Sequence, residues 1–138
     1  MLKTVLFVCV HNAGRSQMAA AFFNRLAGKK AEGISAGTQP ADTVNPVVVQ
    51  AMKEVGIDIS SARPQMLTAE LVEKAEKIIT MGCGADAGGV CPAGFLETED
   101  WALDDPHGQA IEAVRKIRDE VEKRVEKLLT EMRLMNEQ

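Results

Sequence analysis

Several residue types are scarce in this chain, and each scarcity excludes a class of protein. Among 138 residues there are no tyrosines, one tryptophan, two histidines and three cysteines. An odd and sparse set of cysteines makes a poor disulfide framework, and it favours a reducing compartment where thiols serve chemistry or bind metal. We therefore expect a cytoplasmic protein whose cysteines have a chemical use.

An excess of basic charge and a long apolar run are also missing. Sixteen basic residues stand against twenty acidic ones, which gives a net charge of −4. Nucleic acids and anionic membranes attract basic surfaces, so we expect neither as a partner. The apolar residues 5–10 are too few for a signal peptide or a membrane span. With 46% hydrophobic residues, a single soluble domain over residues 1–138 is expected.

The apolar pattern predicts strands and helices in alternation. Strands are expected over residues 3–9, 32–36, 77–81 and, as a short fourth strand, 101–103. Helices are expected over residues 15–27, 46–56, 68–74 and 109–133. Asn45 with Pro46 is typical of a helix start, and Thr68 can cap the short third helix. This order predicts an α/β fold with a central four-stranded parallel sheet and helices on both faces.

The ends of the expected strands carry the reactive side chains. Cys9 ends the first strand, Cys83 follows the third, and Asp105 follows the fourth. Parallel sheets bind ligands beyond the carboxyl ends of their strands, so we expect these three residues to converge at one edge.

The loop between the first strand and the first helix has the composition of an oxyanion site. Residues 9–16 read CVHNAGRS, a Cys-x5-Arg-Ser pattern. A tight loop before a helix N-terminus supplies converging N–H donors and the helix dipole, and an arginine adds a bidentate clamp. Asn and Gly tolerate the backbone angles that such a loop requires. We predict that the anion is bound by Val10, His11, Asn12, Ala13, Gly14 and Arg15.

Cys9 opens this loop and is the predicted nucleophile. Amide donors, Arg15 and the hydroxyl of Ser16 all favour its thiolate form. A motif this short also occurs by chance, and the alternative is a buried strand-end cysteine with a surface Arg15 and a capping Ser16. The position directly between an apolar strand and a helix favours the catalytic interpretation. For His11 we favour a structural hydrogen bond over a place at the rim.

Two further cysteines, Cys83 and Cys91, lie in the glycine-rich residues 82–100. They are either redox-active thiols, incidental buried thiols, or half of a metal site. A zinc site requires four ligands, and His11 and His107 do not form a metal-type pair, so neither a metal nor another cofactor is expected. On spacing alone, Asp105 in the Asp-Asp-Pro sequence would be a turn residue, and its expected place at the strand ends favours a catalytic acid.

The whole set of motifs is more specific than the cysteine loop. It comprises CVHNAGRSQMA, SAG at residues 35–37, VNPVVVQAMKEVGIDIS, ITMGCG, CP and DDP. Over about residues 3–130 the chain resembles the arsenate reductases related to low-molecular-weight protein tyrosine phosphatases. This resemblance implies the following roles: Cys9 as nucleophile, Arg15 as oxyanion-binding arginine, Ser16 as support of the thiolate, Asn12 as organiser of the loop, and Asp105 as general acid.

The resemblance also implies a thiol relay. Cys83 and Cys91 match the two redox cysteines of the reductase branch, so arsenate would be reduced to arsenite through Cys9, Cys83 and Cys91 in turn. Thioredoxin or a small-molecule thiol would regenerate the enzyme. Gly14 stands where thioredoxin-coupled members usually carry another cysteine, outside the relay. Ala20 and Gln65 replace acidic potassium ligands of some members, so potassium is not expected.

Two alternatives remain open. One is a phosphatase on the same scaffold, because the loop alone does not distinguish phosphate from arsenate. Cys83 is the discriminating feature, since a thiol-phosphate is only hydrolysed whereas a thiol-arsenate adduct can be reduced by a second thiol. Without tyrosine, an aromatic clamp for phosphotyrosine would have to come from Trp101 or a phenylalanine. The other alternative is an anion-binding module without turnover.

Overall fold

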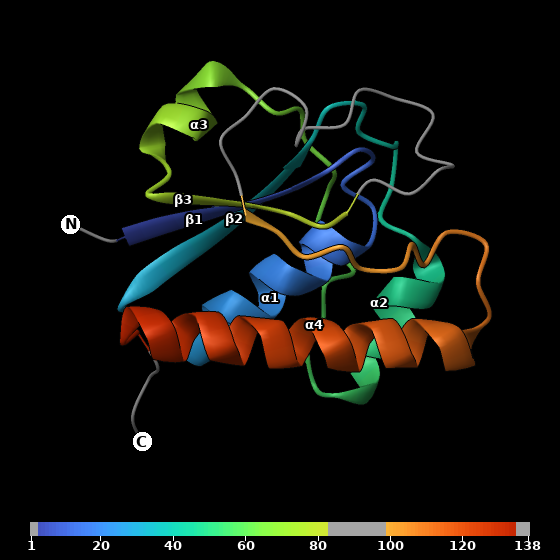
Figure 1. Cartoon of the computed structure of the whole chain (residues 1–138). Helices are drawn as coiled ribbons and strands as arrows, with labels where there is room; N and C mark the ends of the chain where they lie inside the picture. Colours follow the sequence, from blue (N-terminus) through green and yellow to red (C-terminus); the bar gives the residue numbers. More distant parts are fainter. Residues whose placement is uncertain (1–2, 83–98, 135–138) are drawn as a thin grey trace.

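Four parallel strands form the centre of the molecule (Figure 1). The computed structural model describes residues 3–82 and 99–134. The strands are β1 Lys3–Cys9, β2 Ala31–Gly37, β3 Lys77–Thr80 and β4 Glu99–Asp100. They pair in the order β2-β1-β3-β4, and every pairing is parallel. The predicted four-stranded parallel sheet is confirmed.

Helices cover both faces of this sheet, as predicted (Figure 1). The helices are α1 Arg15–Ala27, α2 Pro46–Glu54, α3 Ala69–Lys74 and α4 Ile111–Met132. α1, α2 and α4 share one apolar cluster with the sheet, whereas α3 packs on the opposite face. None of the helices in the described residues is both long and apolar enough to cross a membrane.

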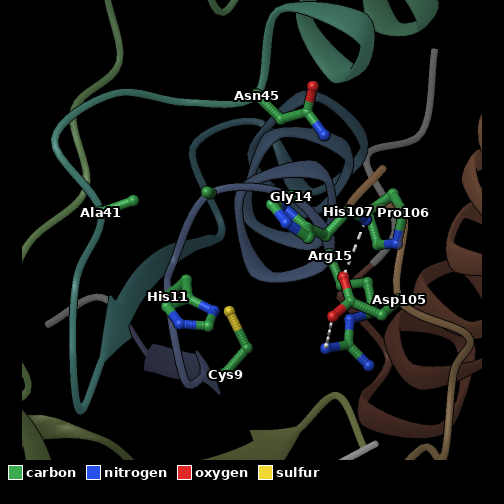
Figure 2. Close-up of a pocket in the computed structure, with 10 residues that line it drawn as sticks. Cys9, His11, Gly14, Arg15, Ala41, Asn45, Asp105, Pro106 and His107 are labelled. Atoms are coloured by element: carbon green, nitrogen blue, oxygen red, sulfur yellow. Dashed lines mark hydrogen bonds and ion pairs between the residues drawn. The ribbon is translucent and has the colours of Figure 1, made fainter. Parts of the chain in front are cut away.

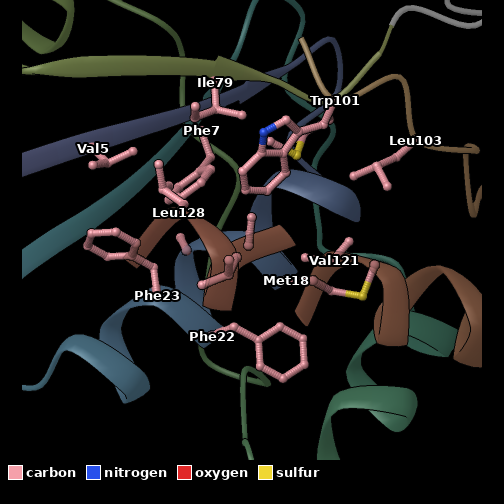
Figure 3. Packing of buried hydrophobic residues seen from close by; sticks show 14 of the residues in the cluster. Val5, Phe7, Met18, Phe22, Phe23, Ile79, Trp101, Leu103, Val121 and Leu128 are labelled. Atoms are coloured by element: carbon pink, nitrogen blue, oxygen red, sulfur yellow. The ribbon is translucent and has the colours of Figure 1, made fainter. Parts of the chain in front are cut away.

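The central strand β1 is apolar on both faces because both faces are covered. Val5 and Phe7 belong to the larger core on the side of α1 and α4, while Leu6 and Val8 belong to the smaller core under α3. In the larger core the ring of Phe7 lies 5.7 Å from Phe23 and 5.8 Å from Trp101, centroid to centroid (Figure 3). The continuous apolar run of β1 therefore fixes Cys9 at the end of a rigid strand.

Most helix boundaries follow the local signals in the sequence. The Asn45 side chain accepts a hydrogen bond from the backbone N–H of Val47, with Pro46 in the first turn. The hydroxyl of Thr68 accepts from the N–H of Leu71. Both caps confirm the predicted helix starts. α2 ends at Glu54, two residues before the predicted end, and α4 is shorter than predicted by two residues at its start and one at its end.

The predicted fourth strand over residues 101–103 was wrong by two positions. The strand is Glu99–Asp100, and the Asp100 carboxylate accepts three hydrogen bonds beside its end. Its Oδ1 accepts from the Thr80 hydroxyl and from the Gly82 N–H at 2.9 Å, and its Oδ2 accepts from the Ala102 N–H at 3.1 Å. Ala102 has a φ of 48°, which is outside the extended region. Because Ala102 leaves the extended region, no regular strand forms over residues 101–103.

Candidate active site

A cavity of about 220 Å³ lies at the carboxyl ends of the strands, where the sequence predicted the site (Figure 2). Cys9 at the end of β1 and Asp105 beyond β4 both line it, and Figure 2 shows Asp105 to the right of Cys9. The full lining is Cys9, His11, Ala13, Gly14, Arg15, Ala41, Asn45, Asp105, Pro106 and His107. The convergence of Cys9 and Asp105 on one edge follows from the parallel order of the strands.

The sulfur of Cys9 is held by hydrogen bonds from its own loop. It lies 2.9 Å from the Ser16 Oγ and accepts from the backbone N–H of Asn12 at 3.0 Å. The Cys9 residue is only 5% exposed, so few water molecules can replace these contacts. Donors that converge on a sulfur stabilise its thiolate, the form that acts as a nucleophile.

Asn12 favours donation of a hydrogen bond from Ser16 to Cys9. The backbone N–H of Gln65 donates to the Asn12 Oδ1 at 2.9 Å, which identifies that atom as the oxygen. The Asn12 Nδ2 then donates to the Ser16 Oγ at 2.7 Å. Because this hydroxyl already accepts a hydrogen bond, its single proton is available for the Cys9 sulfur. Gln17, through its Nε2, also donates to Asn12 at both the backbone oxygen and Oδ1.

The Arg15 side chain lines the cavity and donates hydrogen bonds to three backbone carbonyl groups that follow β3 and β4. Its Nη1 donates to the carbonyl oxygens of Met81 at 3.0 Å, Gly82 at 3.1 Å and Leu103 at 2.7 Å. Its Nη2 lies 3.8 Å from the Asp105 Oδ2. The Arg15 side chain is 7% exposed, so its charge is presented to the cavity rather than to bulk solvent. A buried guanidinium at this edge favours an anionic ligand.

Asp105 is both a turn residue and a cavity residue. Its Oδ1 accepts from the backbone N–H of His107 at 2.9 Å, which is the turn interpretation of the Asp-Asp-Pro sequence. Its side chain is 36% exposed and lines the cavity with Cys9 and Arg15. Asp104 instead lines an adjacent, wider pocket. The structure therefore separates the two neighbouring carboxylates by position.

Some residues of the predicted anion-binding loop line the cavity, and others are buried behind it. His11, Ala13, Gly14 and Arg15 line the cavity. Val10 and Asn12 are 3% and 0% exposed and lie behind the wall, where Asn12 has a φ of 51°. The left-handed conformation of Asn12 was anticipated from its residue type. The structure also places the exposed His11 at the rim, although the sequence favoured a structural role.

Several residues of the site were missed by the sequence analysis. Asn45 and Ala41 reach the cavity from the segment between β2 and α2, and the Asn45 N–H donates to the carbonyl oxygen of Ala13. Gln65 touches Asn12 across 53 positions of sequence. The helix-cap signal at Asn45 was visible in the sequence, but nothing in it indicated that this cap faces the site.

Cys83 and Cys91 lie outside the described residues, so their predicted redox roles stay predictions. The described chain stops at Gly82, whose carbonyl oxygen accepts from Arg15. Among residues 3–82 and 99–134, no group of three or more His, Cys, Asp or Glu side chains is arranged to hold a metal ion.

Comparisons with known proteins agree with this geometry. The family model described as "Low molecular weight phosphotyrosine protein phosphatase" matches residues 4–138. Arsenate reductase 1 of Bacillus cereus is 38% identical over 127 residues, covering 91% of this chain and 92% of that protein. A solved structure of an arsenate reductase in the phosphate-binding state is 34% identical with a TM-score of 0.81, covering 94% of this chain and 98% of that one. A thioredoxin-dependent arsenate reductase of Corynebacterium glutamicum is 37% identical with a TM-score of 0.76, covering 96% of this chain and 63% of that one.

Proposed function

The chain belongs to the low molecular weight phosphotyrosine protein phosphatase family, and on that premise we propose that it is an arsenate reductase whose nucleophile is Cys9. The family resemblance noted in its motifs is confirmed, and the names of its relatives confirm the prediction of an enzyme of the arsenate reductase type. The observation that carries the proposal is the Cys9 sulfur, hydrogen-bonded by Ser16 and Asn12 inside a cavity that Arg15 and Asp105 also line.

The first step is attack by the Cys9 thiolate on the arsenic of a bound arsenate. A sulfur–arsenic bond forms, and one arsenic–oxygen bond breaks. The departing oxygen needs a proton to leave as water, and Asp105, which also lines the cavity, supplies it. Arg15 and the loop N–H groups balance the negative charge of the remaining oxygens.

The second step transfers two electrons to arsenic. A Cys83 thiolate attacks the Cys9 sulfur, a disulfide forms between these two residues, and the sulfur–arsenic bond breaks with its electron pair going to arsenic. Arsenite then leaves. A Cys91 thiolate attacks the sulfur of Cys83, which releases the Cys9 thiolate and leaves a disulfide between Cys83 and Cys91.

An external thiol completes the cycle by reducing the disulfide between Cys83 and Cys91. We propose thioredoxin for this step, in line with the thioredoxin-dependent relative, and a small-molecule thiol is the other candidate. Such a cycle requires a reducing compartment, so we place the protein in the cytoplasm.

The second candidate function is hydrolysis of phosphate monoesters. The description of the family favours it, and the cavity offers the same groups to phosphorus as to arsenic. Cys9 would attack phosphorus, Asp105 would protonate the leaving alcohol, and water would then hydrolyse the thiol-phosphate.

Steady-state assays on the full chain test these functions against each other. Arsenate is supplied with thioredoxin, thioredoxin reductase and NADPH, or with a small thiol and its own reductase, and NADPH oxidation is followed. A matched assay follows hydrolysis of an aryl phosphate. We expect arsenate-dependent NADPH oxidation with thioredoxin and its loss in Cys9→Ser. Ester hydrolysis without arsenate reduction would replace the proposal by the phosphatase, and anion binding without either reaction would indicate a binding module.

A further inference from the structure

Gly14, in the anion loop, lies unusually close to the turn that carries Asp105. A Cβ atom built on Gly14 would lie 2.7 Å from the Pro106 Cγ, and 3.6 Å from both the Pro106 Cδ and the Val48 Cγ2. Ordinary van der Waals contacts of a Cβ begin at 3.4 Å. The Pro106 ring therefore rests on the loop backbone at a distance that only glycine permits.

The turn that carries Asp105 and Pro106 is attached to the edge of the sheet at its N-terminal end. Leu103 is fixed there, because its N–H donates to the Met81 carbonyl oxygen and its own carbonyl oxygen accepts from Arg15. Pro106 is buried, but Gly108, with a φ of 72°, and its neighbours are exposed. A side chain at position 14 would therefore move the rigid Pro106 ring outward, and Asp105 would move with it through the peptide bond.

We propose that Gly14 is a positioning residue that sets how closely Asp105 approaches the reacting group. This inference rests on the proposed function, in which Cys9 attacks and Asp105 donates the proton. Gly14 acts through Pro106. Because Gly14 has no side chain, the Pro106 ring packs directly against the loop backbone, and this contact holds the neighbouring Asp105 carboxyl at the cavity.

The size of the effect follows from the clash. To reach an ordinary contact, the Pro106 Cγ must move from 2.7 Å to at least 3.4 Å from the new Cβ, a shift of 0.7 Å or more. A misplacement of about 1 Å in a catalytic constellation can cost on the order of 10²-fold in rate. For Gly14→Ala we expect a loss of about 10- to 100-fold in any step that depends on proton donation by Asp105, beyond any loss shared by all steps.

Leaving groups of different basicity separate these two cases. Phenyl phosphate needs a proton on its departing oxygen, whereas 2,4-dinitrophenyl phosphate releases a stable phenolate without one. In Gly14→Ala, kcat/KM for phenyl phosphate should fall about 10- to 100-fold more than kcat/KM for the dinitrophenyl ester. A generally damaged site would slow both esters equally, and that result would overturn the inference.

Double variants test whether Gly14 acts through Asp105 and Pro106. Adding Gly14→Ala to Asp105→Asn should cause no further loss with phenyl phosphate, because the acid is already absent. Adding Pro106→Ala to Gly14→Ala removes the clashing Cγ and should recover at least part of the rate. Full additivity with Asp105→Asn, or no recovery with Pro106→Ala, contradicts the inference.

A distant glycine provides the matched control. Gly33 lies on β2, where an added Cβ would be 3.0 Å from the Phe23 ring, so Gly33→Ala strains the core away from the cavity. It should lower the melting temperature without changing the ratio of the two ester rates. If Gly14→Ala does not fold, the double variant Gly14→Ala/Pro106→Ala, which removes the clashing Cγ, is measured in its place, and an equal loss with the two esters would overturn the inference.

The proposed function has its own control in the same experiment. If wild type hydrolyses neither ester, single-turnover arsenate reduction is measured in the same variants, with the same expected epistasis between Gly14→Ala and Asp105→Asn. Absence of both reactions in wild type, or an Asp105→Asn variant as fast as wild type, would refute the proposed function. Normal Asp105 dependence with no selective effect of Gly14→Ala would refute the positioning role alone.

Discussion

Replacement of Asn12 by Ala should damage both the stability of the loop and the reactivity of Cys9. Three hydrogen bonds of the Asn12 side chain are lost: the one it donates to Ser16 and those it accepts from Gln65 and Gln17. The backbone N–H that donates to the Cys9 sulfur is kept, because every residue except proline has one. The variant therefore removes the orientation of the Ser16 hydroxyl while leaving a direct donor in place.

The stability cost has two parts. Leaving the Gln65 N–H without its acceptor costs about 1–3 kcal/mol. Holding alanine at a φ near the 51° of Asn12 adds about 1–2 kcal/mol, because only glycine, asparagine and aspartate adopt this region readily. Asn12→Ala should therefore lose about 2–5 kcal/mol of unfolding free energy, and Asn12→Gly, which avoids the backbone penalty, about 1–3 kcal/mol.

The reactivity cost comes from Ser16. Once its hydroxyl is no longer fixed by Asn12, it is free to rotate away from the thiolate. A hydrogen bond to a charged group contributes about 1.5–3 kcal/mol, which corresponds to about 10- to 150-fold in rate. Both Asn12→Ala and Asn12→Gly should lose reactivity to this extent, even though their stabilities differ.

Alkylation by iodoacetamide at a fixed neutral pH measures this loss directly. The Cys83→Ser/Cys91→Ser background leaves Cys9 as the single thiol, and urea denaturation in the same background gives the free energy of unfolding. Ser16→Ala serves as the reference for complete loss of the hydroxyl. If Asn12→Gly alkylates as fast as its parent, or if Ser16→Ala does, the hydrogen-bond chain does not support the thiolate and the reasoning is wrong.

Two other predictions concern acidic residues. Asp105→Asn should slow turnover by about 10²–10⁴-fold with little change in oxyanion binding, whereas Asp104→Asn should have a small effect; a larger effect of Asp104→Asn would mean that the wrong carboxylate was assigned. Hydrogen bonds from Arg115 lower the pKa of Glu54 below its ordinary value of 4.5. The ionised form is therefore favoured by folding, so Glu54→Gln should be less stable than wild type at neutral pH, with a difference that disappears as the pH falls through the carboxyl range; a difference independent of pH would exclude this ion pair as the cause.

The parts of the fold that could be predicted from sequence are those set by local signals. The β1 strand and the α1 helix match their predicted bounds because an apolar run ends at Cys9 and a helical pattern begins at Arg15. The fourth strand was misplaced because Ala102 has a positive φ within the predicted range, and neither residue propensity nor hydrophobic periodicity predicts that local conformation.

The site could be predicted only where its residues belong to one loop or end a strand. Cys9 and Asp105 lie at one edge, as the strand order predicted, whereas Cys83, the third residue of that prediction, lies outside the described residues. The support of Asn12 by Gln65 and the contact of Pro106 with Gly14 join segments 53 and 92 positions apart. Such contacts depend on how whole helices and strands pack against one another, and a local sequence pattern does not predict which distant segments meet.

Disulfide mapping after arsenate treatment tests the central claim most directly. The fully reduced protein is treated with arsenate in the absence of any external thiol, free thiols are blocked, and disulfide-linked peptides are identified by mass spectrometry together with the arsenite released. We predict a disulfide between Cys83 and Cys91 in wild type, one between Cys9 and Cys83 in Cys91→Ser, and about one arsenite per chain in both. Arsenite release with a disulfide that does not include Cys83, or no reaction of arsenate with the reduced wild type, would contradict the proposed relay.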